Sequence, residues 1–190
     1  MSAVPHTRAD SSTEDVRAAV RSLEREQVRR VTPAPLRMTG MFEFDAAQAH
    51  LFERVSNPVA MATWFPLLKG GDLDHAPSAT AGDWGEGSQR TCYTNGMGTL
   101  HETIHYWDAP NAYTYEVRNF MMPLSQHLAL MACFERRGGG TILVWNQYFE
   151  LTGIAMRHAF PTVMLNLMNV GMKRLAKDLG GAGGRMSAVR

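Results

Sequence analysis

The sequence predicts an α+β fold in which a curved antiparallel sheet of about six or seven strands wraps around a long C-terminal helix. Two observations predict it. Several strand-like runs follow one another between residues 87 and 151, separated by short turns rich in Gly, Asn, Asp and Pro, which is typical of consecutive hairpins. After them, from residue 156 to 179, apolar residues recur at helical spacing. A long meander has to bury one face, and this last helix carries the broad apolar stripe that can cover it.

Residues 1–36 are expected to form an extension that precedes the main domain at 37–180. The first twelve residues are small and polar, and we expect them to be disordered. Ser11 and Glu14 resemble a capping box at the start of a helix over residues 13–31, which has only a thin apolar stripe. That stripe either docks on the domain or pairs with a second copy in a homodimer, and docking is the favoured interpretation.

The main domain is predicted to begin with a strand over residues 36–44. Asp45 is a suitable N-cap for a short helix, and Asn57-Pro58 starts a second one that ends at Trp64-Phe65-Pro66. Residues 69–85, rich in Gly, Asp, Ala and Pro, are expected to be a long loop.

The meander and the end of the chain complete the prediction. A glycine-rich segment after the last helix is expected to release a flexible tail over residues 181–190. The strands of the meander are predicted at residues 87–95, 99–108, 112–121, 124–136 and 141–151.

Composition narrows the classes of function. With 19 basic and 18 acidic residues, the chain lacks the basic excess of a nucleic-acid-binding protein. The N-terminus has no apolar signal region, and no uncharged apolar run reaches the ~18 residues of a membrane span, so a cytoplasmic protein is expected. Cys92 and Cys133 are predicted to be buried free thiols. Phosphate-binding, nucleophile-elbow and zinc-ligand motifs are absent, so neither a metal nor a cofactor is expected.

Several short motifs occur in the order that is found in a known superfamily. Taken together, they resemble the START-like (SRPBCC) superfamily of polyketide cyclases/dehydratases and lipid-transport proteins, which has the Bet v 1-like helix-grip fold. The resemblance covers about residues 38–180 and implies a deep cavity for an apolar or aromatic molecule. It leaves activity open, because the superfamily ranges from cyclisation and dehydration to simple carriage. The motifs are Phe42-Glu-Phe-Asp45-Ala46, Asn57-Pro58, Trp64-Phe65-Pro66, Gly85-Glu-Gly87, Leu100-His-Glu102-Thr-Ile104 and Gly139-Gly140-Thr141.

Three side chains on the predicted strands are candidates for acid–base catalysis. His101 and His127 are of the type that moves protons near neutral pH. Glu102 lies on the face opposite His101, among apolar neighbours. The alternative interpretation is structural: each histidine is a satisfied or partly exposed residue, and Glu102 pairs with an arginine such as Arg90 or Arg118.

The candidate ligand-binding residues are apolar or aromatic, with one amide among them. Methionines on one face of the last helix are flexible enough to fit an irregular ligand, and alternate residues of the last strand form an aromatic wall. Ordinary core packing is the alternative interpretation for each of them. They are Trp64, Tyr106, Tyr115, Trp145, Gln147, Phe149, Met164, Met168 and Met172.

The leading hypothesis is a protein that binds a small hydrophobic molecule, aromatic, polyketide-like or lipid-like, with metal-free cyclase or dehydratase chemistry as one version of it. Two alternatives stay open. One is a carrier or sensor with the same cavity and no turnover. The other is a protein-interaction module in which side chains fill the core.

Overall fold

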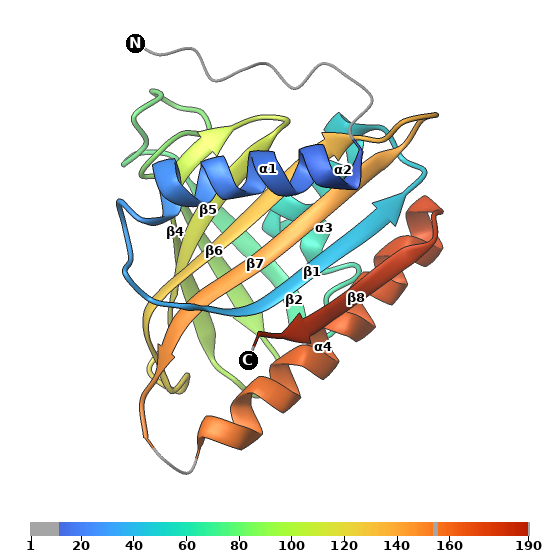
Figure 1. The fold of residues 1–190 in the computed structure, drawn as a ribbon. Helices are drawn as coiled ribbons and strands as arrows, with labels where there is room; N and C mark the ends of the chain where they lie inside the picture. The colour runs from blue at the N-terminus through green and yellow to red at the C-terminus, as the bar shows by residue number, and fades with distance from the viewer. Residues whose placement is uncertain (1–11, 154–155, 190) are drawn as a thin grey trace.

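A single eight-stranded antiparallel sheet and one long helix form the main part of the protein (Figure 1). The computed structural model describes residues 12–153 and 156–189, with only the helical backbone for residues 156–158. Residues 1–11 of the predicted disordered start lie outside the described part of the chain, whereas its last residue, Ser12, is ordered as the N-cap of the first helix. The strand order across the sheet is β2-β3-β4-β5-β6-β7-β1-β8. The prediction of a helix-grip α+β fold is confirmed, with eight strands in place of six or seven.

The elements have the following bounds. The strands are β1 (Leu36–Phe44), β2 (Leu68–Asp74), β3 (Gln89–Thr94), β4 (Thr99–Asp108), β5 (Ala112–Arg118), β6 (Leu124–Glu135), β7 (Thr141–Leu151) and β8 (Gly183–Ala188). The helices are α1 (Thr13–Leu23), which continues as a π-helical turn η1 (Glu24–Val28), then α2 (Gln48–Ser56), α3 (Pro58–Met61) and α4 (Met156–Leu179).

The central strands of the sheet are buried on both faces. Every residue from Thr141 to Phe149 of β7 is buried, so its side chains pack alternately into two separate apolar layers. Leu143 and Trp145 point to the concave face, where α2, α3 and α4 complete the main core. Val144 and Tyr148 point to the convex face. The sheet therefore divides the protein into two cores of different size.

The N-terminal helix covers the convex face of the sheet (Figure 1). Val16, Val20 and Val28 are buried there, against alternate residues of β6 and β7. The helix thus docks on the domain, as the favoured interpretation of the sequence predicted. Its capping box is formed by Ser12 and Asp15, one residue later than the predicted Ser11 and Glu14; Ser11 lies outside the described residues.

Two strands of the sheet were not predicted. The first, β2, is an edge strand that lies largely in the predicted loop 69–85. Its sequence is rich in Gly and Asp and carries no strand pattern, because β2 depends on its pairing with β3 for its conformation. The second, β8, lies in the predicted flexible tail and pairs with β1. Asn169 of α4 holds β8 by bonding both backbone groups of Met186, at 2.8 and 3.1 Å.

Close packing explains why β8 is so rich in glycine. A Cβ atom on Gly184 would lie 2.0 Å from the Met41 carbonyl oxygen of β1, so only glycine fits there. The glycines that indicated a flexible tail therefore permit a tight strand pairing, which sequence composition does not reveal.

The caps of the short helices differ in part from the prediction. Asn57 caps α3 as expected, accepting a hydrogen bond from the Val59 N–H at 2.9 Å. Asp45, by contrast, does not cap α2, whose N-cap is Ala47. The chain needs two more residues to reach the helix, and Asp45 instead forms an ion pair with Arg136 at 2.9 Å.

The remaining predictions about the fold concern thiols and membranes. Cys92 and Cys133 are buried free cysteines, as predicted. Among the described residues, no helix has the length and apolar character that crossing a membrane requires.

The role of β8 gives a first testable prediction. Met186 is 1% exposed and packs in the main core, so Met186→Ala should lower the free energy of unfolding by about 2–5 kcal/mol. The neighbouring exposed residue is the control, and Arg185→Ala should cost less than about 0.5 kcal/mol. Urea denaturation measures both. Equal small effects would mean that residues 183–188 form the flexible tail of the sequence-based prediction.

Candidate functional site

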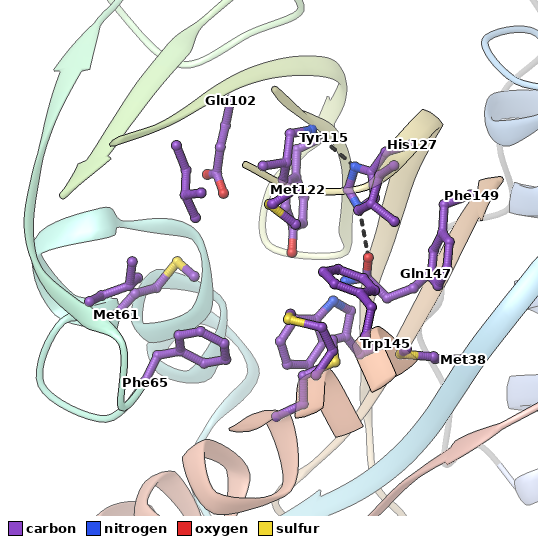
Figure 2. Close-up of a pocket in the computed structure, with 17 residues that line it drawn as sticks. Met38, Met61, Phe65, Glu102, Tyr115, Met122, His127, Trp145, Gln147 and Phe149 are labelled. Carbon is purple, nitrogen blue, oxygen red and sulfur yellow. Dashed lines mark hydrogen bonds between the residues drawn. The ribbon is translucent and has the colours of Figure 1, made fainter. Parts of the chain in front are cut away.

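A cavity lies between the concave face of the sheet and the helices α3 and α4 (Figure 2). Its volume is about 70 Å³. A water molecule needs about 10–15 Å³ measured in this way, whereas pockets for drug-sized ligands span ~300–1,000 Å³. The lining consists of Met38, Met61, Phe65, Leu68, Leu100, Glu102, Tyr115, Val117, Met122, Leu124, His127, Trp145, Gln147, Phe149, Phe160, Met164 and Met168.

Flexible side chains make up much of the wall. Five of the lining residues are methionines, which have three rotatable bonds and adapt to irregular shapes. Rotation of these side chains can enlarge a cavity of this size at little cost. The cavity is therefore a small space in a deformable apolar wall.

Six of the nine predicted ligand-binding residues line this cavity. They come from three elements: β5, β7 and α4. Their role in binding remains a prediction, but the structure brings them together. They are Tyr115, Trp145, Gln147, Phe149, Met164 and Met168.

Three predicted ligand-binding residues do not line the cavity. Trp64 is fully buried, donates its indole N–H to the Arg54 carbonyl at 2.9 Å, and packs against α4 at Gly171. Met172 lies one turn beyond Met168 and fills the core. Tyr106 packs on the convex side near α1, because a bulge between Ile104 and Tyr106 reverses the alternation of β4.

The three candidate catalytic residues lie on different faces of the sheet. Glu102 and His127 line the cavity, whereas His101 is exposed on the opposite face of β4. The assignment of His101 to proton transfer in the cavity therefore needs correction, because successive residues of a strand point to opposite faces. Of the three candidates, two remain.

His127 is held in one tautomer by two hydrogen bonds (Figure 2). The Val117 backbone N–H donates to Nδ1 at 3.0 Å, so Nδ1 carries no proton. Nε2 then carries the proton and donates it to Gln147 Oε1 at 2.7 Å. Burial lowers the pKa of His127 to about 4, so the ring is neutral near pH 7.

A row across the sheet brings Tyr115 and Gln147 together. Both residues are opposite Ala129 in the pairing of β5, β6 and β7, and the short alanine side chain leaves space between them. Burial raises the pKa of Tyr115 well above its ordinary value, so its hydroxyl keeps its proton. Trp145 lies two residues before Gln147 on the same face, and its buried indole N–H has no partner among the described residues.

Glu102 is paired with a fully buried arginine. Arg90 Nε lies 2.7 Å from Glu102 Oε2, although its N–H points off the line between the two atoms, so the pairing is mainly electrostatic. Burial alone would lower the pKa of Arg90. The electrostatic influence of Glu102, Tyr113 and Tyr115 outweighs burial and raises this pKa above its ordinary value. The structure therefore has the structural alternative for Glu102, a pairing with Arg90. Cys92 Sγ also contacts Oε2, at 3.6 Å.

Sequence reasoning missed several lining residues. Leu100 could have been found, because it shares a strand face with Glu102. Met38 was visible as an inner position of the first strand. Met122 and Leu124 gave no signal, because they flank a Met-Pro break between two strands. Phe160 and Phe65 belong to the cavity only through the packing of α4 against the end of α3.

In residues 12–153 and 156–189, no group of three or more His, Cys, Asp or Glu side chains is placed to hold a metal ion.

A comparison with protein families decides the relationship that the motifs indicated. Residues 35–180 match the family described as polyketide cyclase/dehydrase and lipid transport. The chain belongs to this family. It is part of the START-like (SRPBCC) superfamily, and the family is one of domains that bind hydrophobic ligands. No curated protein matches the chain.

Solved structures show the same fold at low sequence identity. A protein from Thermobifida fusca is 19% identical, with a TM-score of 0.61 over 75% of this chain and 93% of its own. The protein XoxI from Bacillus cereus is 15% identical, with a TM-score of 0.60 over 74% and 93%. Major latex-like protein 151 from Panax ginseng is 14% identical, with a TM-score of 0.57 over 76% and 99%. At these identities the likeness concerns the fold alone.

The buried state of His127 predicts a pH dependence of stability. In the unfolded chain a histidine titrates near pH 6.5, and in the folded protein His127 has a pKa of about 4. The unfolded chain therefore binds more protons between these values, and the free energy of unfolding should fall by about 3 kcal/mol as pH drops from 6.5 to 4. In the His127→Gln variant this decrease in the free energy of unfolding should be absent. Urea denaturation at several pH values measures it.

The control for this experiment is His101→Gln, because that side chain is exposed and outside the cavity. It should follow the wild-type pH dependence. If His127→Gln also followed it, the ring would not be held neutral by burial.

The ion pair gives a further prediction. Arg90→Met leaves Glu102 buried without its partner and should lower the free energy of unfolding by about 3–5 kcal/mol. The double variant Arg90→Met/Glu102→Leu should cost less than Arg90→Met alone, because no unpaired charge remains. Breaking the exposed pair of Arg37 with Glu150, by Arg37→Met, should cost at most about 1 kcal/mol. Additive costs for Arg90 and Glu102 in denaturation experiments would contradict this account.

Proposed function

We propose that the protein binds an uncharged, mostly apolar, ring-bearing molecule in this cavity and holds it without chemical change, as a carrier or sensor. The observation that carries the proposal is the state of His127 and Glu102, the two candidates for proton transfer that line the cavity. His127 uses both ring nitrogens in hydrogen bonds, and Glu102 is paired with Arg90 through Oε2. While these contacts persist, neither nitrogen of His127 and only one oxygen of Glu102 is available to a ligand.

The shape and chemistry of the wall support a ring-bearing ligand. Aromatic side chains of Tyr115, Trp145 and Phe149 come from the sheet, and Met164 and Met168 face them from α4. Aromatic rings offer flat apolar surfaces, and methionines fit around them. Because the cavity measures only about 70 Å³, binding requires these methionines to change rotamer.

Acid–base cyclase or dehydratase chemistry is the second candidate, and one observation favours it. The contacts of Glu102 with Arg90 and Cys92 both use Oε2. Its carboxylate points toward the cavity in Figure 2, so Oε1 is the oxygen that a substrate would meet. In this version Glu102 moves the proton, and His127 orients Gln147.

The third hypothesis, an interaction module based on the N-terminal helix, has less support. Its apolar stripe of Val16, Val20 and Val28 is buried by the protein's own sheet. A homodimer would therefore have to use another surface.

The first experiment identifies the ligand. Native mass spectrometry of protein purified from its own host, followed by solvent extraction, should yield a stoichiometric uncharged ring compound. Incubating that compound with fresh protein separates the two candidates. A carrier returns it unchanged, whereas an enzyme converts it and loses the rate, but not the affinity, in Glu102→Gln. A protein without any bound compound, and without affinity for aromatic or lipid probes, would contradict both.

A cavity-blocking variant tests where binding occurs. Met164→Trp places a larger side chain in the wall of the cavity. It should weaken the binding of N-phenyl-1-naphthylamine by about tenfold or more, which corresponds to ~1.4 kcal/mol of binding free energy. The fluorescence of this probe measures its binding. Val163 is the exposed neighbour on the same helix, 53% accessible, so Val163→Trp is the matched control. Equal affinity of both variants would place the probe outside this cavity.

A further inference from the structure

The indole N–H of Trp145 is a hydrogen-bond donor without an acceptor. Trp145 is 2% exposed, and its Nε1 has no partner within the described part of the chain. Buried donors in native proteins nearly always have an acceptor, and each exception calls for an explanation. Trp145 lines the cavity (Figure 2), where the methionine sulfurs around it are only weak acceptors. A ligand atom is the acceptor that this wall lacks.

The polar groups beside Trp145 are donors as well. Gln147 is two residues further along the same face of β7, and its Oε1 is already used by His127, so its amide N–H groups are what remains. The Tyr115 hydroxyl keeps its proton and lies in the same row of the sheet as Gln147, whose side chain interacts with it. Polar groups of three residues therefore gather on one wall, and an oxygen acceptor on the ligand would satisfy the one among them that has no partner, the Trp145 N–H.

The charges around the cavity exclude an anionic acceptor. The Glu102 carboxylate lines the cavity and would repel a ligand carboxylate or phosphate. The Arg90 guanidinium offsets part of this charge, but Arg90 does not line the cavity, so the charged group that a ligand meets there is the carboxylate. The acceptor oxygen must therefore be uncharged.

We propose that the ligand presents an uncharged carbonyl oxygen, as in a ring-bearing ketone, to the indole N–H of Trp145, with the Gln147 amide and the Tyr115 hydroxyl beside it. This contact selects ketones over hydrocarbons and acids of the same shape. The inference rests on the proposed function, because it names the chemical class that the same cavity takes.

The test uses three naphthalene probes that differ in one group. They are 2-acetonaphthone, 2-isopropenylnaphthalene, in which a methylene replaces the carbonyl oxygen, and 2-naphthoate. Affinities are measured by calorimetry for the wild type and for Trp145→Phe, which removes the N–H. The two neutral probes differ in hydration, but this difference is the same for both proteins. The ratio of their affinities, compared between proteins, therefore isolates the hydrogen bond.

The expected result is a loss of preference for the ketone. Trp145→Phe should weaken the binding of 2-acetonaphthone about five- to tenfold more than the binding of 2-isopropenylnaphthalene, because one buried hydrogen bond is lost only with the ketone. In the wild type, 2-naphthoate should bind at least about tenfold more weakly than the ketone, because of Glu102. Trp84→Phe is the matched control, since Trp84 is not part of the cavity wall, and it should leave the ratio unchanged.

Other outcomes overturn the proposal in distinguishable ways. If Trp145→Phe weakens both neutral probes equally, Trp145 contributes packing only. If 2-naphthoate binds most tightly, the acceptor is an anion. In the first case the proposed function stands. In the second case the protein still binds a ring compound in the cavity, but the uncharged ligand of the proposed function is contradicted together with this inference. If the wild type binds none of the three probes, the proposed function fails together with this inference.

Discussion

The buried ion pair of Arg90 and Glu102 is the interaction on which the main core depends. Arg90 Nη1 donates to the Ser56 carbonyl at 2.6 Å, so the arginine joins β3 to the end of α2. Its guanidinium packs against the rings of Tyr113 and Tyr115 on β5. Its partner on β4 forms part of the cavity wall. Burying two charged side chains away from water costs free energy unless the two form an ion pair. That requirement fixes the relative positions of three strands and a helix, and it leaves a negative charge at one end of the cavity.

The cavity combines an adaptable apolar part with a rigid polar part. The polar groups of Tyr115, His127 and Gln147 come from adjacent strands, so the sheet sets their spacing, and hydrogen bonds fix the orientation of His127. The opposite wall includes methionines of α3 and α4 that can change rotamer. Under the proposed function, such a wall accepts ligands of different outline, whereas the strand residues distinguish them by their polar groups.

The described part of the N-terminal extension, residues 12–36, lies largely outside the part of the chain that matches the family, residues 35–180, yet it is integrated into the structure. It buries the convex face of the sheet, which would otherwise expose apolar residues of β6 and β7. It also reaches the cavity indirectly. Thr32 donates a hydrogen bond to the Gln126 carbonyl at 2.8 Å, at the irregular start of β6 and immediately before His127. The extension thus helps to set the position of a residue on the other face of the sheet.

The sequence by itself determined the fold class, the central meander and the last helix, because local alternation and helical spacing record which faces are buried. It also indicated about half of the cavity wall, including Trp145, Gln147 and Met168. The edge strands β2 and β8 depended on tertiary structure, since their glycines are explained only by the strand beside them. The same holds for the positions of Tyr106 and His101, because one bulge in β4 and the phase of that strand decide which side chains reach the cavity. The pairing of Glu102 and the unpartnered Trp145 N–H were likewise decided in three dimensions, where distant strands meet and water is excluded.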